Sequence, residues 1–136
     1  MIKNLFAGLL LLLPAIVSTP ASAEEEPAGP KYTYFTLEPE ITTNFVTKGK
    51  NLGFINVRVD LMVDDPGKVQ ILEHHSPLIR DAITEVLSQE SETEVKSLSG
   101  REELRKACLE KVNALLLAET KERVVTELLF TKYLYQ

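Results

Sequence analysis

Two adjacent histidines, His74 and His75, have the chemistry for a metal site or for proton transfer, and Glu73 adds a carboxylate beside them. Neighbouring residues on a helix point roughly 100° apart. The two imidazoles therefore cannot readily close on one metal ion, in contrast to histidines four residues apart. We expect a helix end or turn with solvated imidazoles, and no metal site.

Cys108 is the single cysteine of the chain and lies between Leu104 and Val112 at helical spacing. A thiol in such an apolar stripe behaves as a small hydrophobic side chain and not as a reactive thiolate. One cysteine also excludes an intramolecular disulfide and a Cys-based zinc site. We expect neither catalysis nor a cofactor at this residue.

The remaining candidates for chemistry are explained by turns. Residues 49–51 lack the spacing and the Lys-Ser/Thr pair of a phosphate-binding loop. Asp64 and Asp65 precede Pro66 and fit turn and cap chemistry. No nucleophile, base and orienting group come together, so the sequence indicates a non-enzymatic interaction protein.

Two alternatives stay open. A periplasmic enzyme would require a fold that brings His74 or His75 against Cys108 or a carboxylate. A soluble carrier or interaction module unrelated to motility would require, for an apolar ligand, core residues that fail to meet. The net charge of -5, without a clustered basic surface, excludes a nucleic-acid partner.

The first residues predict export. Lys3 is followed by an apolar run over residues 5–17 and by the small-x-small sequence at 21–23, which is typical of a signal peptide. We expect residues 1–23 to be cleaved after Ala23. The alternative is an N-terminal membrane anchor, which needs about 20 apolar residues, whereas this run is shorter and contains Pro14.

Residues 24–31 form an acidic, Pro- and Gly-containing linker, and the folded domain covers residues 32–136. Strands are predicted at 32–37, 41–46 and 54–63. The third gives the clearest signal, because apolar side chains occupy every second position. Its expected core face is Ile55, Val57, Val59, Leu61 and Val63.

Asp65 and Pro66 predict the start of a short helix, and two long helices follow. We expect Ser76 to cap the first long helix and Ser99, with Glu102, to form a capping box for the second. A polar loop at 88–97 joins them. The expected buried stripes are Ile79, Ala82, Ile83, Val86 and Leu87, then Leu104, Ala107, Cys108, Val112, Leu115 and Leu116.

The last predicted strand, residues 122–136, is apolar on both faces. One face is expected to carry Val124, Leu128, Phe130 and Leu134. The opposite face is expected to carry Leu129, Tyr133 and Tyr135. Such a strand is either covered within its own domain or completed by a neighbour. We therefore predict an interaction surface at Leu129, Lys132, Tyr133 and Tyr135, which meets the exposed helix face at Glu103 or Glu110 of another copy.

The order of elements indicates an α+β fold, an antiparallel-rich sheet of about four strands with two long helices and one short helix on one face. Several stretches together resemble the FliL family of flagellar basal-body-associated proteins. They are residues 34–39, the strand that ends at Asp65-Pro66, residues 77–83, residues 100–105 and the closing strand 130–136. The likeness covers roughly residues 32–136.

The resemblance implies a stomatin-like periplasmic domain without enzymatic activity. Members of this family associate with the flagellar stator and basal body, can form rings as homo-oligomers, and affect motor torque, swimming or swarming, and rotation direction in chemotaxis. A typical member is held in the inner membrane by one transmembrane helix. This sequence departs from that pattern at residues 1–23, so we expect a secreted periplasmic paralogue, the alternative being a single-pass inner-membrane anchor.

Overall fold

The computed structural model describes residues 29–49 and 51–136. The predictions of a signal peptide or membrane anchor at 1–23, and most of the linker at 24–31, therefore lie outside the described residues.

The sheet is built around β3 (Gly53–Val63), which pairs antiparallel with each of the three remaining strands that the structure describes. β1 (Thr33–Thr36) and β2 (Ile41–Phe45) pair with its two halves along one edge, and β4 (Glu127–Tyr135) runs along the other. β3 is long enough to pair with both β1 and β2 along the same edge. The described sheet therefore contains four strands but is at most three strands wide at any point.

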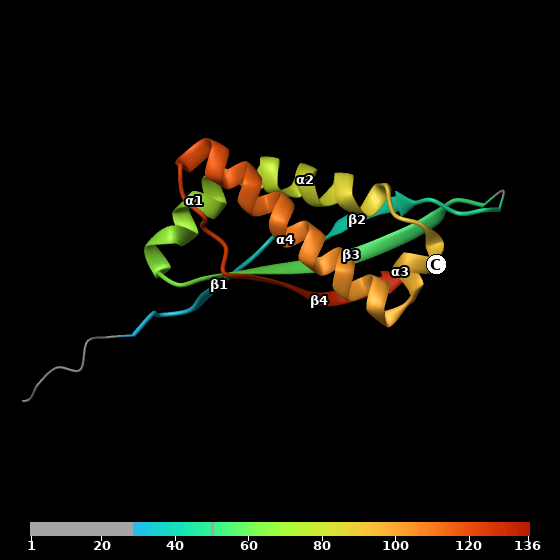
Figure 1. The fold of residues 1–136 in the computed structure, drawn as a ribbon, viewed down its shortest axis with the longest axis horizontal. Helices are drawn as coiled ribbons and strands as arrows, with labels where there is room; N and C mark the ends of the chain where they lie inside the picture. Colours follow the sequence, from blue (N-terminus) through green and yellow to red (C-terminus); the bar gives the residue numbers. More distant parts are fainter. Residues whose placement is uncertain (1–28, 50) are drawn as a thin grey trace, which may run out of the picture.

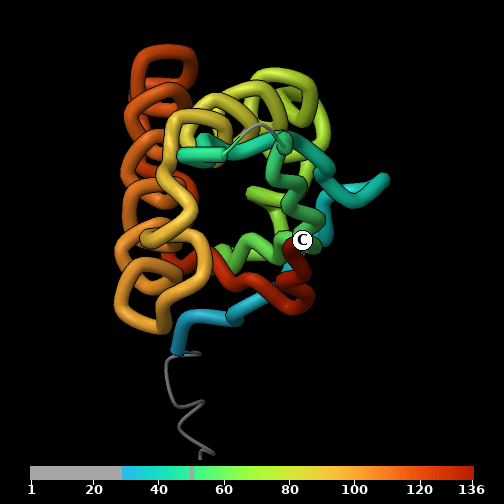
Figure 2. The backbone as a smooth tube through the Cα atoms, turned by 90° about the vertical axis from the view of Figure 1, so that its right-hand side faces the viewer, coloured from blue at the N-terminus to red at the C-terminus, as the bar shows by residue number. Residues whose placement is uncertain are grey.

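The helices lie on one face of this sheet (Figures 1 and 2). After the 3-10 turn η1 (Pro66–Lys68) come α1 (Val69–His74), α2 (Ser76–Ser88), α3 (Glu92–Lys96) and α4 (Leu98–Thr120). Within the described part of the chain, no helix covers the opposite face, which we call the open face. The predicted α+β class with a four-stranded antiparallel sheet is confirmed.

The core lies between the sheet and the helices, and the alternation in β3 is confirmed. Its five predicted core residues are 0–1% exposed. The α2 stripe is also buried, except that Val86 is only partly so. In α4 the stripe is narrower than predicted, because Ala107 is exposed and Leu115 is half-buried. Asn113 is buried instead, since its side-chain amide bonds the backbone N–H and C=O of Val125 at 3.0 and 2.8 Å.

Helix starts were predicted with mixed success. Asp65 caps η1 as expected, accepting the Gly67 N–H at 2.8 Å. The predicted cap at Ser76 is wrong, because the helix begins at that residue and His75 precedes it. The predicted box at Ser99 is also wrong, because Ser97 caps α4 by accepting the Gly100 N–H at 2.9 Å. The predicted loop at 88–97 contains α3, whose own cap is Ser91.

Candidate interaction surface

β4 does not keep one alternation of faces along its length. Its register against β3 shifts between Arg58 and Val59, so that Lys132 pairs with Arg58 and Phe130 pairs with Val59. Thr131 is the extra residue of this β-bulge. Because side chains alternate with a period of two, one extra residue moves every later side chain to the other face.

The predicted faces of the last strand are therefore correct before the bulge, where Leu128 and Phe130 lie opposite Leu129, and wrong after it. Tyr133 and Tyr135 pair with the core residues Val57 and Ile55, and so belong to the helix-covered face. Leu129, Lys132 and Leu134 pair with Asp60, Arg58 and Asn56 on the open face. The strand is also shorter than predicted, since it starts at Glu127. The predicted surface residues are thus divided between two sides of the sheet.

The two tyrosines pack among groups of α3 and α4. The Tyr133 hydroxyl donates to the Val95 carbonyl at 2.6 Å, and the Arg101 guanidinium lies 4.7 Å from the centre of the same ring. Burial raises the pKa of Tyr133 to about 12, so the hydroxyl stays a donor at neutral pH. Tyr135 is 45% exposed, with the Lys96 ammonium 5.8 Å from its ring centre. Tyr133 is therefore mainly structural.

An ion triad occupies the middle of the open face. The Glu40 carboxylate accepts from Arg58 at 2.7 Å and from Lys132 at 2.8 Å. The Lys132 ammonium is the main cause of a lowered pKa of Glu40, and Arg58 adds to it. Sequence reasoning placed Arg58 on the outer face of β3 but gave no signal for Glu40, which lies 92 residues from Lys132 in the chain.

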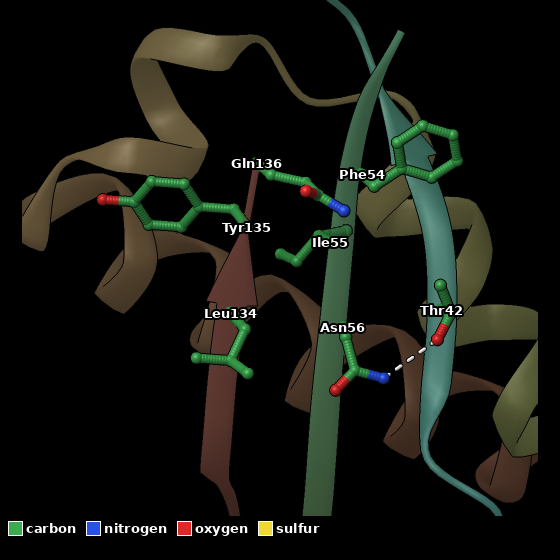
Figure 3. A pocket seen from close by; sticks show the side chains of 7 residues that line it. All are labelled: Thr42, Phe54, Ile55, Asn56, Leu134, Tyr135 and Gln136. Atoms are coloured by element: carbon green, nitrogen blue, oxygen red, sulfur yellow. Dashed lines mark hydrogen bonds between the residues drawn. The ribbon is translucent and has the colours of Figure 1, made fainter.

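A shallow pocket of about 460 Å³ opens beside the triad on the same face (Figure 3). Phe54 and Leu134, 42% and 57% exposed, flank it from β3 and β4. Asn56 lies between them and donates from Nδ2 to the Thr42 hydroxyl at 2.9 Å. Its Oδ1 atom is buried and accepts no hydrogen bond from the described residues. The pocket thus combines apolar walls with the polar side chains of Thr42, Asn56 and Gln136.

The outer side of α4 carries the two predicted acidic contacts. Glu110 faces Arg123 at 3.1 Å, and Glu103 faces Lys106 at 3.9 Å, in pairs that are more than half exposed. Such surface pairs contribute little to stability, about 0–1 kcal/mol. Glu103 and Glu110 lie on the helix layer, whereas Lys132 lies on the open face. A contact between them would require two copies of the chain.

The family model described as "Flagellar basal body-associated protein FliL" matches residues 34–136. The chain belongs to the FliL family. The match begins within β1 and ends with the residue after β4, so it includes every strand of the sheet and every described helix. The triad and the pocket both lie inside this FliL-family domain.

A curated relative, "Flagellar protein FliL" of Aquifex aeolicus (strain VF5), is 26% identical over 102 residues. That alignment covers 75% of this chain and 60% of the relative, so the chain spans less than two thirds of the relative's length. Among the described residues of this FliL-family chain, no helix has the length and apolar character needed to cross a membrane.

The candidate catalytic residues of the FliL-family domain come from different elements, with His74 at the end of α1 and Cys108 in α4. Cys108 is fully buried in α4, and burial raises the pKa of its thiol to about 12. The rings of His74 and His75 pack edge to face at 4.9 Å, and His75 Nδ1 lies 2.8 Å from the Ile71 carbonyl oxygen. In residues 29–49 and 51–136, no three His, Cys, Asp or Glu side chains are grouped to hold a metal ion.

Proposed function

We propose that this flagellar basal-body-associated protein works without catalysis, by contact with the stator or another motor component, and that it affects flagellar rotation, swimming or swarming, and chemotaxis. The observation that carries the proposal is the open face of a FliL-family domain. This face presents exposed Phe54 and Leu134 beside a charged triad. Exposed apolar side chains rimmed by polar groups are typical of protein-binding surfaces.

The absence of catalysis is supported by the state of the candidate groups. A buried thiol with a raised pKa is a poor nucleophile at neutral pH. His75 Nδ1 faces the backbone carbonyl of Ile71 in α1, so this ring nitrogen already has a partner within the protein. Neither group lines the pocket on the open face.

The proposal also includes self-association in the periplasm. Lys132 on the open face and Glu103 or Glu110 on α4 lie on opposite sides of one chain. A contact between such different surfaces is heterologous, and it generates a ring when the rotation between subunits closes. Cysteine pairs at Lys132 and Glu103, or at Lys132 and Glu110, should give intermolecular disulfides in cells, in a background where Cys108 is replaced by alanine.

The matched control pairs Lys132→Cys with Asp81→Cys, which is an exposed position on α2. Products from the α4 pairs that exceed those from the α2 pair would support the head-to-tail geometry. Equal yields from all pairs would indicate random collision and would contradict it.

Deleting the gene is the direct test of the motor function. We expect smaller swimming and swarming zones and lower stator occupancy at the basal body, each restored by the wild-type copy. Normal motility and normal stator occupancy in the deletion strain would exclude the proposed function and favour an interaction module unrelated to motility.

A further inference from the structure

The pocket over Asn56 has three features of a binding site for a side chain. Its walls are two large apolar groups that remain exposed, Phe54 and Leu134. Its size, about 460 Å³, falls within the roughly 300–1,000 Å³ that is usual for ligand pockets. Its third feature is a polar contribution to the lining from the side-chain amides of Asn56 and Gln136.

The next residue pair along the sheet supplies positive charge. Arg58 follows Asn56 by two residues on the same face, and Lys132 pairs with Arg58 across the strands. Both cations share the single carboxylate of Glu40. Asp60, one step further along β3, accepts the Thr36 hydroxyl at 2.7 Å. The triad of two cations and one carboxylate therefore carries one net positive charge beside the pocket, which favours an added anion.

We propose that this site binds an extended segment of a partner protein in which a Trp or Tyr side chain is followed two residues later by Asp or Glu. Residues two apart in an extended chain are about 6.6 Å apart on one face, which is the spacing of Asn56 and Arg58 themselves. The aromatic ring lies between Phe54 and Leu134, and its N–H or O–H stays at the open edge of the pocket. The carboxylate lies against Arg58 and Lys132.

This inference rests on the motor-contact part of the proposed function and not on self-association, because it names the part of the domain that touches the motor component. Charge complementarity selects the occupant. A segment with a basic residue in place of the carboxylate would meet two cations, and like charges that face each other destabilise a contact. The second copy of the chain offered by the self-association model is the competing occupant.

The chain contains no tryptophan, so the emission of a Trp-containing peptide reports binding without background. The probe is an acetylated and amidated peptide of sequence Thr-Trp-Thr-Glu-Thr, titrated with the full chain at low salt. We expect a saturable blue shift of the Trp emission. The matched peptide with Lys in place of Glu should bind at least fivefold more weakly, and added salt should remove most of that difference.

Two exposed leucines provide matched variants. Leu134→Asp should abolish the blue shift, whereas Leu117→Asp, at a 51% exposed position on α4, should bind like the unchanged chain. Arg58→Glu should remove the preference for the Glu peptide. Equal thermal midpoints for the two Asp variants establish that both are folded. No blue shift with the unchanged chain, or equal binding by both Asp variants, would overturn the proposal.

Sedimentation of the same proteins distinguishes a partner segment from a second copy of the chain as the occupant of the site. If the unchanged chain self-associates, Leu134→Asp is monomeric and no peptide binds, then the face belongs to a second copy and the proposal fails. Motility separates this site from the general function. A swimming defect in the deletion strain that the Leu134→Asp copy fully restores overturns the site alone, whereas no defect in the deletion strain overturns the motor function alone.

Discussion

Neighbouring residues of β3 have opposite surroundings, and this decides what each contributes. Val59 is 1% exposed and belongs to the core, whereas the Arg58 side chain is half exposed and pairs with Glu40. The difference follows from the pleat of a strand, in which successive side chains point to opposite faces. A charged group is tolerated at one position and strongly disfavoured at the next.

Val59→Asp should unfold the domain or cost at least about 4 kcal/mol, because it buries a carboxylate without a partner. Arg58→Ala should cost less than about 1 kcal/mol, because it removes one exposed ion pair. Urea unfolding of both variants tests the register. Equal losses of unfolding free energy would contradict the assignment of these residues to opposite faces.

At the scale of elements, α3 packs chiefly against α4, and β4 adds one hydrogen bond to it. Val95 is 1% exposed, and its carbonyl, near the end of α3, accepts the Tyr133 hydroxyl. The last carbonyls of a helix have no partner within the helix, so the tyrosine satisfies one of them. The bulge at Thr131 makes this possible, because it turns Tyr133 towards the helices.

Tyr133→Phe should lower stability by about 0.5–1.5 kcal/mol, the usual net contribution of one hydrogen bond. Hydrogen exchange of the backbone amides in residues 92–97 should become faster, while exchange in β3 changes only with global stability. Tyr135→Phe is the control, because that ring is more exposed and its hydroxyl is not part of this contact. Unchanged exchange in α3 of the Tyr133→Phe variant would contradict the role of this hydroxyl.

The Glu40 triad joins the segment between β1 and β2 to β3 and β4, and it predicts a dependence on pH. The pKa of Glu40 is lowered in the folded protein, chiefly by the Lys132 ammonium. A lowered carboxyl pKa stabilises the fold above the ordinary value of 4.5, and this contribution is lost as the pH falls through the folded-state value.

Glu40→Gln should therefore destabilise the domain at pH 7 and have little effect near pH 2. Urea midpoints of the variant and the unchanged protein at both pH values provide the measurement, and Glu103→Gln on α4 is an exposed control. If the urea midpoints of Glu40→Gln and the unchanged protein differ as much at pH 2 as at pH 7, Glu40 does not act through its charge.

At the scale of the whole molecule, the sheet has one face covered by helices and one open face. A single core lies between the sheet and the helices, as expected for a small domain. The contacts proposed above use the open face and the outer side of α4, and export of the domain is predicted from residues 1–23.

The prediction of export follows from Lys3, the short apolar run and the sequence Ala21-Ser22-Ala23. Intact mass of the protein released from the periplasm should place Glu24 at the N-terminus. Replacement of Ala21 and Ala23 by bulky residues should block cleavage and leave the protein in the membrane fraction. If the wild-type protein is instead found in the membrane fraction with residues 1–23 retained, the single-pass anchor is favoured.

The sequence by itself determined the fold class, the strands near β1 to β3, the core face of β3 and the buried stripe of α2. These features depend on local periodicity, and a period of two or of 3.6 is visible within one segment. The Asp65 cap was also predicted from a local pattern, Asp65 followed by Pro66. The cap of α4 was misplaced because Ser97 and Ser99 offer competing starts two residues apart, and the cap of α2 was misplaced by one residue, from His75 to Ser76.

Only the tertiary structure decided which faces of β4 carry which side chains. The bulge at Thr131 lets the two halves of β4 pair with β3 in different registers, and no local pattern encodes a partner strand some 70 residues away. The triad of Glu40, Arg58 and Lys132 has the same origin. It joins three segments that meet only in the sheet, so the open-face site could not be read from any one of them.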